Sequence, residues 1–373
     1  MNIQMVDLFT QYEKIKKEID SEIETVIRSS VFVKGGKVVE FEENLRKYLK
    51  VGHVISCGNG TDALHITLMA LNLKEGDEVI TTPFTFVSTL EVLALMKLKP
   101  VLADVDPNSF NIRPESVANC ITQNTKAIVP VHLYGQCSDM EPLMNIAKKY
   151  NLYMIEDACQ ALGTEYHFSN GETIKAGTIG DIACNSFFPT KNLGAFGDGG
   201  AIFTNNDELG HSMRSIANHG MSKRYHYNQI GMNSRLDAIQ AAILDVKLKY
   251  LDQYILARQN AAAFYDQELS EIKGIIVPAR VSYSSHSFHQ YTIKVPERRN
   301  DLQQFLKEKG IPSMVYYPLP LHLQEAYQYL GYQQGDFQVA EELSRQVLSL
   351  PMHTELTEEQ LNYIVSAIRQ FFN

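Results

Sequence analysis

The chain has 373 residues, of which 45% are hydrophobic and 21% charged, a composition typical of a globular enzyme with a substantial core. Its formal net charge of −9 argues against a general nucleic-acid-binding protein, whose surface would be basic. The N-terminal residues contain no apolar signal segment, and no apolar run approaches the roughly 20 residues that span a bilayer. We therefore expect neither a nucleic acid nor a membrane as partner.

The 5 cysteines are odd in number, widely spaced and without a CxxC pair. This pattern indicates buried, reduced thiols and suits a cytoplasmic protein. The histidines lack the spacing of metal ligands, so the sequence predicts no metal site.

Hydrophobic periodicity predicts two N-terminal helices followed by alternating strands and helices. The helices are expected at residues 7–30, 38–49, 60–73, 87–98, 114–121 and 140–150. The strands are expected at residues 53–57, 78–83, 100–105, 127–132, 152–157 and 181–188. Short apolar runs of this kind are typical of strands that are buried on both faces. The alternation predicts an α/β fold with a largely parallel sheet and helices on both faces.

The C-terminal part of the chain has a different pattern. Apolar residues at helical spacing predict one long helix over residues 235–269. Beyond it we expect strands at 290–295 and 313–317 and helices at 299–309, 339–348 and 357–372. The chain therefore divides into a large domain at residues 1–250 and a smaller C-terminal α/β domain at residues 251–373, a division that suits its length.

Ligands of open parallel sheets bind at the carboxyl ends of the strands, and a phosphate-binding turn is expected after the first strand. Gly60 and Thr61 open a helix there, and backbone N–H groups at a helix N-terminus form a cradle for phosphate. The segment from Gly58 to Ala63 also fits a G-x-G-x-x-A dinucleotide fingerprint. However, the next strand does not end in the acid that would hold a ribose. A plain N-capping turn is the third reading.

Further polar and aromatic residues follow the other strands. Phe86 can stack on a flat ring, although an aromatic residue near a helix start is more often part of the core. Asp157 can pair with a protonated ring nitrogen or serve as a helix N-cap. Ser186 and Lys191 precede a glycine-rich turn, where the amine either faces solvent or is desolvated and forms a Schiff base. In this order along an α/β chain, the four features together favour pyridoxal 5′-phosphate as cofactor.

The chain also resembles a known family, the DegT-type sugar aminotransferases, which are pyridoxal-phosphate enzymes of fold type I, the aspartate-aminotransferase-like fold. The resemblance covers nearly the whole chain and is strongest at residues 59–64 (NGTDAL), 156–160 (EDACQ), 186–194 (SFFPTKNLG) and 231–237 (GMNSRLD). The family usually has alanine where Cys159 stands, a replacement of one small residue by another.

The resemblance implies a role for each matched residue. Lys191 would form the Schiff base, Asp157 would pair with the pyridine nitrogen and Gln160 would bind the ring hydroxyl. The remaining cofactor contacts would be a stacking ring and donors to the phosphate, namely Phe86, Gly60, Thr61 and Ser186. Asn233 would reach the phosphate in a neighbouring subunit, which implies a homodimer with shared active sites.

Within the family, the chain is most similar to enzymes that aminate C3 of a UDP-linked 2-acetamido-3-keto sugar, especially the hexuronic acid, with L-glutamate as amino donor. Such enzymes supply amino sugars for surface polysaccharides. The family often has histidine at the position of Tyr316, so the sugar assignment stays open, and dTDP-linked 3-keto or 4-keto-6-deoxy sugars are the alternative.

Tyr316 and Tyr317 either contact the sugar or pack at a domain seam. Arg235 either holds a carboxylate or caps a helix, and His322 either touches substrate or is structural.

Two other functions compete with transamination. A sugar dehydratase of the same fold would carry histidine in place of Lys191. A regulatory protein that kept the fold would not need the full set of Lys191, Asp157, Gln160 and Asn233. The visible absorbance of a bound cofactor, and its loss on addition of glutamate, separates these possibilities.

Overall fold

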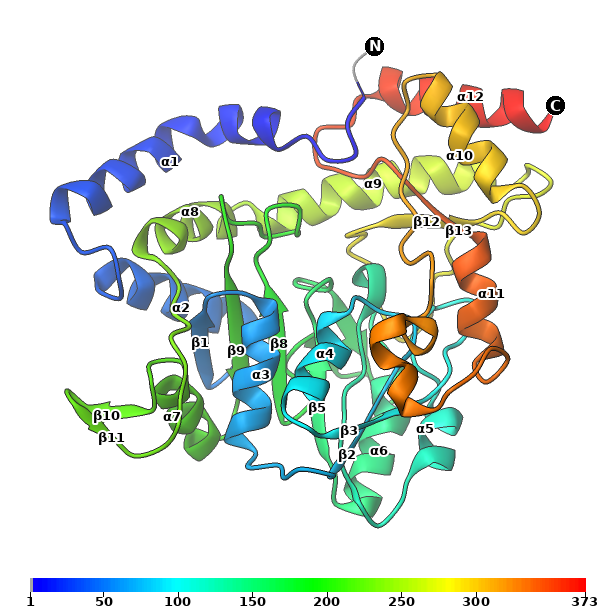
Figure 1. Ribbon diagram of the computed structural model, residues 1–373. Coiled ribbons are helices and arrows are strands. Elements are labelled where there is room, and N and C mark those ends of the chain that lie inside the picture. The colour runs from blue at the N-terminus through cyan, green and yellow to red at the C-terminus, as the bar shows by residue number, and fades with distance from the viewer. Residues whose placement is uncertain (1–2) are drawn as a thin grey trace.

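In residues 3–373, which the computed structural model describes, seven strands form one central sheet in the order β1-β9-β8-β5-β4-β2-β3 (Figure 1). Neighbouring strands are parallel from β3 to β8, and β9 runs antiparallel to both β8 and β1. The predicted, largely parallel sheet is therefore confirmed. Its strands are β1 (His53–Cys57), β2 (Glu78–Thr81), β3 (Lys99–Leu102), β4 (Thr125–Ile128), β5 (Tyr153–Asp157), β8 (Ile182–Ser186) and β9 (Gly200–Thr204).

Helices cover both faces of the sheet, and alternation along β8 shows why. Ile182 and Cys184 pack in one buried cluster, whereas Ala183 between them packs in another, because successive side chains of a strand point to opposite faces. The first cluster includes residues of α3 (Gly60–Ala70), α4 (Ser88–Leu95) and α7 (Asp207–Ile216). The opposite face is covered by α2 (Gly36–Leu49), α8 (Ala238–Leu248), α5 (Pro114–Cys120) and α6 (Met140–Tyr150).

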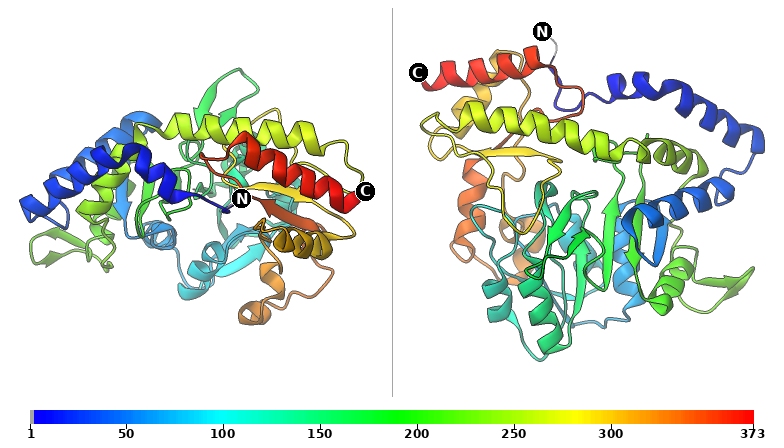
Figure 2. Two further views of the ribbon diagram at one scale, coloured as in Figure 1. Left: turned by 90° about the horizontal axis from the view of Figure 1, so that it is seen from above. Right: turned by 180° about the vertical axis from the view of Figure 1, so that it is seen from behind.

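The C-terminal part of the chain has its own hydrophobic cluster. Two antiparallel strands, β12 (Tyr291–Lys294) and β13 (Val347–Leu350), lie at its centre. The helices α9 (Leu251–Leu269), α10 (Arg299–Glu308) and α12 (Glu358–Phe372) pack around them. Figure 2 shows this part from above and from behind, next to the body that holds the large sheet.

Three predictions for this part of the chain are wrong in detail. The single helix expected at residues 235–269 is two helices, because the chain turns at Lys249 and Tyr250 between α8, which packs on the sheet, and α9, which leads into the second cluster. The strand expected at residues 313–317 is one isolated bridge from Met314 to Ser349. The helix expected at residues 339–348 ends early as α11 (Gln338–Gln346), and Val347 begins β13.

The remaining elements lie outside the sheet. Helix α1 (Leu8–Ser29) begins at its N-cap Asp7, whose carboxylate accepts a hydrogen bond of 2.9 Å from the backbone N of Thr10, and it packs on α8. Among the described residues, no helix is both long and apolar enough to cross a membrane. The short elements are β6 (Glu165–His167), β7 (Thr173–Lys175), β10 (Met221–Lys223), β11 (His226–Tyr227) and the 3-10 helices η1 (Leu133–Gly135), η2 (Leu321–Leu323) and η3 (Glu325–Leu330).

Candidate active site

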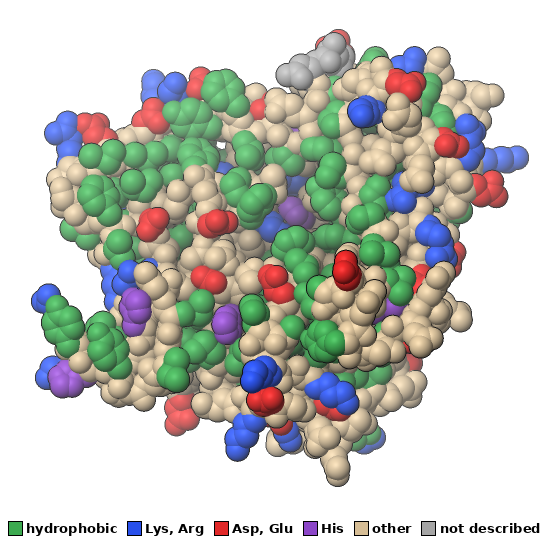
Figure 3. All heavy atoms as spheres, in the orientation of Figure 1, with side chains coloured by type: hydrophobic (Ala, Val, Ile, Leu, Met, Phe, Trp, Pro, Cys, Tyr) green, Lys and Arg blue, Asp and Glu red, His purple; other side chains and the backbone are tan. Residues whose placement is uncertain are grey.

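A cavity of about 770 Å³ lies at the carboxyl ends of the parallel strands, large enough for a cofactor together with a substrate. Figure 3 shows a hollow near the centre of the face, with a basic side chain and a histidine next to each other inside it. Nine of the twelve site residues expected from the sequence line the cavity: Gly60, Thr61, Phe86, Asp157, Gln160, Ser186, Lys191, Tyr316 and Tyr317.

The N-terminus of α3 forms one wall of the cavity. The side chain of Asn59 caps this helix by accepting a hydrogen bond of 2.8 Å from the backbone N of Asp62. Gly60 passes so close to the strand end that a Cβ there would lie 2.8 Å from the Cβ of Ser186. The hydroxyls of Thr61 and Ser88 are 2.7 Å apart. Free backbone N–H groups and hydroxyls at a helix N-terminus suit a phosphate group.

Lys191 lies in a tight loop between β8 and β9. The backbone N of Ala195 donates to the O of Phe187 over 2.8 Å and closes the base of the loop. A Cβ on Gly194 would lie 2.2 Å from the carbonyl O of Pro189, so the turn requires glycine. Burial lowers the pKa of Lys191 from its ordinary value, since desolvation disfavours the charged ammonium. The amine is thereby prepared to react as a nucleophile with a carbonyl.

Asp157 ends β5 with its side chain in the cavity, where it is 5% exposed. One carboxylate oxygen accepts a hydrogen bond of 2.8 Å from the hydroxyl of Thr89, and the other accepts one of 3.3 Å from the backbone N of Cys159. In the part of the chain that the structure describes, no salt bridge joins Asp157 to a cation. Lys191 interacts with this carboxylate electrostatically but without direct contact, and a protonated pyridine nitrogen would give the buried carboxylate a directly bound cation.

Gln160 and two tyrosines form the wall next to Asp157. The Gln160 side-chain oxygen accepts a hydrogen bond of 2.8 Å from the backbone N of Tyr134, and its amide nitrogen donates to the Tyr317 hydroxyl over 3.3 Å. The ring of Tyr317 lies 6.4 Å from that of Phe86, which is 56% exposed. Phe86 therefore has a free face towards the cavity.

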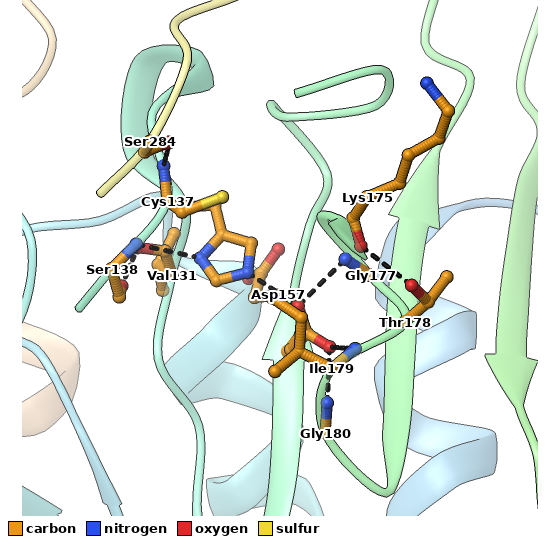
Figure 4. Close-up of polar contacts among 12 residues, drawn as sticks. Val131, Cys137, Ser138, Asp157, Lys175, Gly177, Thr178, Ile179, Gly180 and Ser284 are labelled. Carbon is orange, nitrogen blue, oxygen red and sulfur yellow. Dashed lines mark hydrogen bonds and ion pairs between the residues drawn. The ribbon is translucent and has the colours of Figure 1, made fainter. Parts of the chain in front are cut away.

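A buried polar cluster holds Asp157 from the other side of the sheet. The carboxylate of Glu156 accepts hydrogen bonds of 2.7–2.8 Å from the backbone N–H groups of Gly177, Ile179 and Gly180. In Figure 4 dashed lines run from these three labelled residues to the two oxygens of one carboxylate. The Nε2 of His132 donates to the same carboxylate over 2.9 Å.

The orientation of His132 follows from its second nitrogen. The backbone N of Ser138 donates to Nδ1 over 3.1 Å, so the ring proton is on Nε2. The backbone of His132 also donates to the carbonyl O of Asp157, whose own N donates to Pro130. The cluster therefore fixes the end of β5 from which Asp157 projects.

Three residues expected in the site lie elsewhere in this chain. Asn233 is exposed and does not line the cavity. Arg235 lies with Lys34 and Arg214 in a second, smaller hollow of about 220 Å³. His322 is buried, and its Nε2 lies 3.1 Å from a carboxylate oxygen of Glu341. The structure thus gives His322 a structural partner and does not bring it to the cavity.

Several cavity residues were not anticipated from the sequence. They include Thr89, which binds Asp157, and Tyr134, whose backbone binds Gln160. His289 and Gln290, from the segment before β12, also line the cavity. Thr89 follows Phe86 by about one helical turn, which is a usable signal. His289 and Gln290 carry no local motif, since tertiary packing alone brings them to the site.

The cavity fits pyridoxal phosphate in its donor set and in the carboxylate of Asp157, which forms no salt bridge with a described residue. Lys191, with its lowered pKa, and Asp157 line the same cavity, and the hydroxyl-rich helix N-terminus suits a phosphate. This arrangement on a mostly parallel sheet defines a pyridoxal-phosphate-dependent transferase of fold type I. More narrowly, the chain belongs to the DegT/DnrJ/EryC1/StrS aminotransferase family, which it matches over residues 13–369.

Individual relatives cover the full length of the chain. A pleiotropic regulatory protein of Geobacillus stearothermophilus is 49% identical over 100% of this chain and 99% of its own. A UDP-2-acetamido-2-deoxy-3-oxo-D-glucuronate aminotransferase of Pseudomonas aeruginosa is 43% identical over 98% of this chain and 99% of its own. The crystal structure of DesV of S. venezuelae in complex with a ketimine intermediate superposes with a TM-score of 0.96, at 34% identity, covering 100% of this chain and 99% of that one.

Proposed function

We propose that this aminotransferase moves an amino group from L-glutamate to the C3 keto group of a UDP-linked 2-acetamido-3-keto sugar or its uronic acid. The observation that carries the proposal is that Lys191, whose pKa is lowered by burial, shares one cavity with the buried carboxylate of Asp157, which forms no salt bridge with a described residue. The sugar class is supported by the similarity to the Pseudomonas aeruginosa enzyme. A dTDP-linked keto sugar is the alternative, since relatives at 35% and 39% identity are named as dTDP-amino-sugar transaminases.

We assign the cofactor contacts from the cavity walls. Gly60, Thr61 and Ser186 would hold the phosphate at the N-terminus of α3. Asp157 would receive the protonated pyridine nitrogen, and Gln160 would bind the ring hydroxyl.

The aromatic residues at the mouth of the cavity complete the assignment. Phe86, which has an exposed ring, would stack on the cofactor. Tyr316 and Tyr317 would contact the sugar.

Lys191 would be the catalytic residue. Bound pyridoxal phosphate supplies an electron sink for the carbanion that forms at the reacting carbon. The Nζ of Lys191 removes the proton from Cα of the amino donor, for which its lowered pKa suits it. In the second half of the reaction, the same Nζ delivers a proton to the sugar carbon that receives the amine.

A homodimer with shared active sites is the proposed assembly. Asn233 is exposed and lies outside its own cavity, so its amide is free to reach a neighbour. The apolar side chains of Phe9, Phe32, Val39 and Ile230 are 46–84% exposed. Figure 3 shows hydrophobic side chains gathered over α1, α2 and the β10–β11 hairpin, on the same side of the molecule. An apolar face of this kind is typical of an interface.

The hollow that contains Arg235 is proposed to face the partner's substrate. It combines the cationic side chains of Lys34, Arg214 and Arg235 with the carboxylate of Glu42. Glu42 already pairs with Arg214 at 2.9 Å. Burial, with Arg235 and Arg214 nearby, lowers the pKa of Lys34. An excess of cations suits an anionic substrate, so Arg235 would bind the uronate.

We also propose a boundary between two domains, with residues 1–250 as the cofactor-binding part and 251–373 as the smaller part. The turn at Lys249 and Tyr250 between α8 and α9 and the separate hydrophobic cluster of the C-terminal part support this division. Limited proteolysis that cuts far from residue 250 and leaves stable fragments would contradict it.

The decisive experiment is a product assay with UDP- and dTDP-linked 3-keto and 4-keto sugars. Wild-type protein loaded with cofactor should consume L-glutamate and release 2-oxoglutarate with the UDP-3-keto sugar, whereas Lys191→Ala should fold and show no turnover. Turnover by that variant near the wild-type rate would exclude the mechanism. If wild type binds cofactor but transfers no amine to any sugar, the regulatory role suggested by the Geobacillus relative's name gains support.

The shared site is tested by complementation. Lys191→Ala and Asn233→Asp should each be inactive as homodimers, since aspartate would place a negative charge against the phosphate. Co-expressed chains that form mixed dimers should regain activity, because one of the two sites is then intact. Verified mixed dimers without activity would reassign Asn233 to a local role.

A further inference from the structure

His289 is a buried side chain in the cavity wall whose hydrogen-bonding capacity is not used up. It lines the cavity and is 6% exposed. Its Nδ1 is buried and has no hydrogen-bond partner among residues 3–373. Buried polar atoms in proteins are almost always paired. An unpaired atom on the wall of a ligand cavity therefore indicates a group reserved for a ligand.

The neighbouring side chain determines which hydrogen the imidazole offers. The amide nitrogen of Gln290 is a donor and lies 3.5 Å from the Nε2 of His289, so Nε2 is the acceptor and the ring proton is on Nδ1. Gln290 is held in turn by the hydroxyl of Tyr316. The unpaired Nδ1–H is thus a donor, and its missing partner is an acceptor.

The charges around His289 favour an anionic acceptor. Arg258, which is 2% exposed, donates from Nη1 to the backbone carbonyls of Phe288, His289 and Met352 over 3.0–3.4 Å. Among the described residues, no salt bridge pairs Arg258 with a carboxylate. Burial, together with Lys191 and Arg258, holds the pKa of His289 well below its ordinary value, so the imidazole is a neutral donor in a positive field.

The carboxylates that line the cavity do not supply this acceptor. Asp157 is bound to Thr89 and Cys159, and Asp62 accepts a hydrogen bond of 2.6 Å from the hydroxyl of Ser234. The third, Asp198, is exposed. None of these three carboxylates is bonded to His289 in the described structure.

We propose that the Nδ1–H of His289 donates a hydrogen bond to the α-carboxylate of the amino donor, which makes His289 a determinant of donor specificity. The inference rests on the proposed function, since an amino acid must enter the cavity. The α-carboxylate is bonded to the same carbon that loses its proton to Lys191. Its binding group must therefore be a neighbour of Lys191, as His289 is.

The test uses the holoenzyme and the donor alone, without any sugar. α-Methyl-L-glutamate has no Cα proton, so it binds without turnover, and the visible spectrum of the cofactor reports its Kd. Its α-carboxamide keeps every other group but lacks the charge. Wild type should bind the carboxylate about 10- to 100-fold more tightly than the carboxamide, the range expected for a charge-assisted hydrogen bond.

Three variants separate binding from folding. His289→Phe fills the space but has no donor, so it should lose most of the preference for the carboxylate while binding the carboxamide as wild type does. His289→Asn places an amide N–H near the position of Nδ1 and should recover part of the preference. His286→Phe is the matched control, because His286 is 7% exposed, stacks on Phe288 and does not line the cavity. It should keep the wild-type preference.

The outcomes separate the inference from the function on which it rests. If His289→Phe keeps the wild-type ratio of the two Kd values, or weakens both ligands equally, the assignment of the α-carboxylate to His289 is wrong although the enzyme is still an aminotransferase. If wild type gives no spectral change with any amino acid, both the proposed function and this inference fail. Cofactor absorbance and thermal unfolding confirm that each variant is folded.

Discussion

Replacement of Glu156 by glutamine tests how firmly the sheet holds Asp157. The substitution keeps the size of the side chain but turns one carboxylate oxygen into an NH₂ group. Oε1 accepts from Ile179 and Gly180, and Oε2 accepts from Gly177 and His132. Whichever way the amide is oriented, two donors then face an NH₂ group instead of an oxygen.

The size of the effect follows from these four contacts. Hydrogen bonds to a charged group contribute about 1.5–3 kcal/mol each, so the loss of two should lower the free energy of unfolding by about 4 kcal/mol. His132 cannot relieve the conflict without cost, because moving its proton to Nδ1 would break the bond from Ser138. Asp157 is the next residue along β5, so the cofactor should also bind more weakly.

Urea unfolding and cofactor titration of wild type and Glu156→Gln measure both effects. Glu165→Gln is the matched control, because Glu165 is 45% exposed in its side chain and lies 3.7 Å from Lys175. A surface ion pair contributes about 0–1 kcal/mol, so this variant should differ little from wild type. A Glu156→Gln protein within 1 kcal/mol of the control would refute the proposed bracing of Asp157.

Two further variants test separate parts of the site, and a third tests the buried amine of Lys247 in α8, whose Nζ donates a hydrogen bond of 2.6 Å to the carbonyl O of Gly194. Thr89→Val removes a hydrogen bond to Asp157 and should lower kcat/KM by about tenfold or more in steady-state assays; an unchanged value would deny Thr89 this role. Gly60→Ala places a Cβ 2.8 Å from that of Ser186 and should weaken cofactor binding by about tenfold in equilibrium dialysis, the cost of modest overpacking. Burial lowers the pKa of Lys247 to about 8, so the unfolded chain binds more protons between pH 8 and 10.5 and wild-type stability should rise with pH in that window. Relative to Lys247→Met, the gain in urea unfolding should reach about 3 kcal/mol, and parallel curves would contradict it.

Most of the sheet and of its surrounding helices was predictable because the signals are local, although β9 and α7 were not predicted. Short apolar strands alternate with amphipathic helices, and each element can be recognised within a dozen residues. Helix α6 and strand β1 have the predicted bounds. The errors arise where local and tertiary signals differ: residues 235–269 are helical throughout by periodicity, but packing on two separate clusters requires a turn at Lys249 and Tyr250.

Part of the candidate site was predictable for the same reason. Gly60, Asp157 and Lys191 each follow a recognisable strand, and parallel strands bring their carboxyl ends to one edge of a sheet. Their arrival in one cavity is a consequence of topology, so the sequence order was sufficient. The position of His322 could not be predicted in this way, because a proline-rich loop gives no indication of which of its side chains face the cavity.

The sequence by itself determined the class of fold, the strand-end positions of Asp157 and Lys191 and the glycines that their turns require, since periodicity and backbone geometry act over short stretches of chain. Only the tertiary structure decided that Thr89 holds Asp157, that Glu156 and His132 brace it from behind, and that His289 lines the cavity with an Nδ1 that has no partner among the described residues. His132 and Glu156 are 24 positions apart in the sequence, and Thr89 and Asp157 are 68 positions apart. These contacts depend on burial and on which polar atoms remain unpaired, and both are properties of the packed molecule.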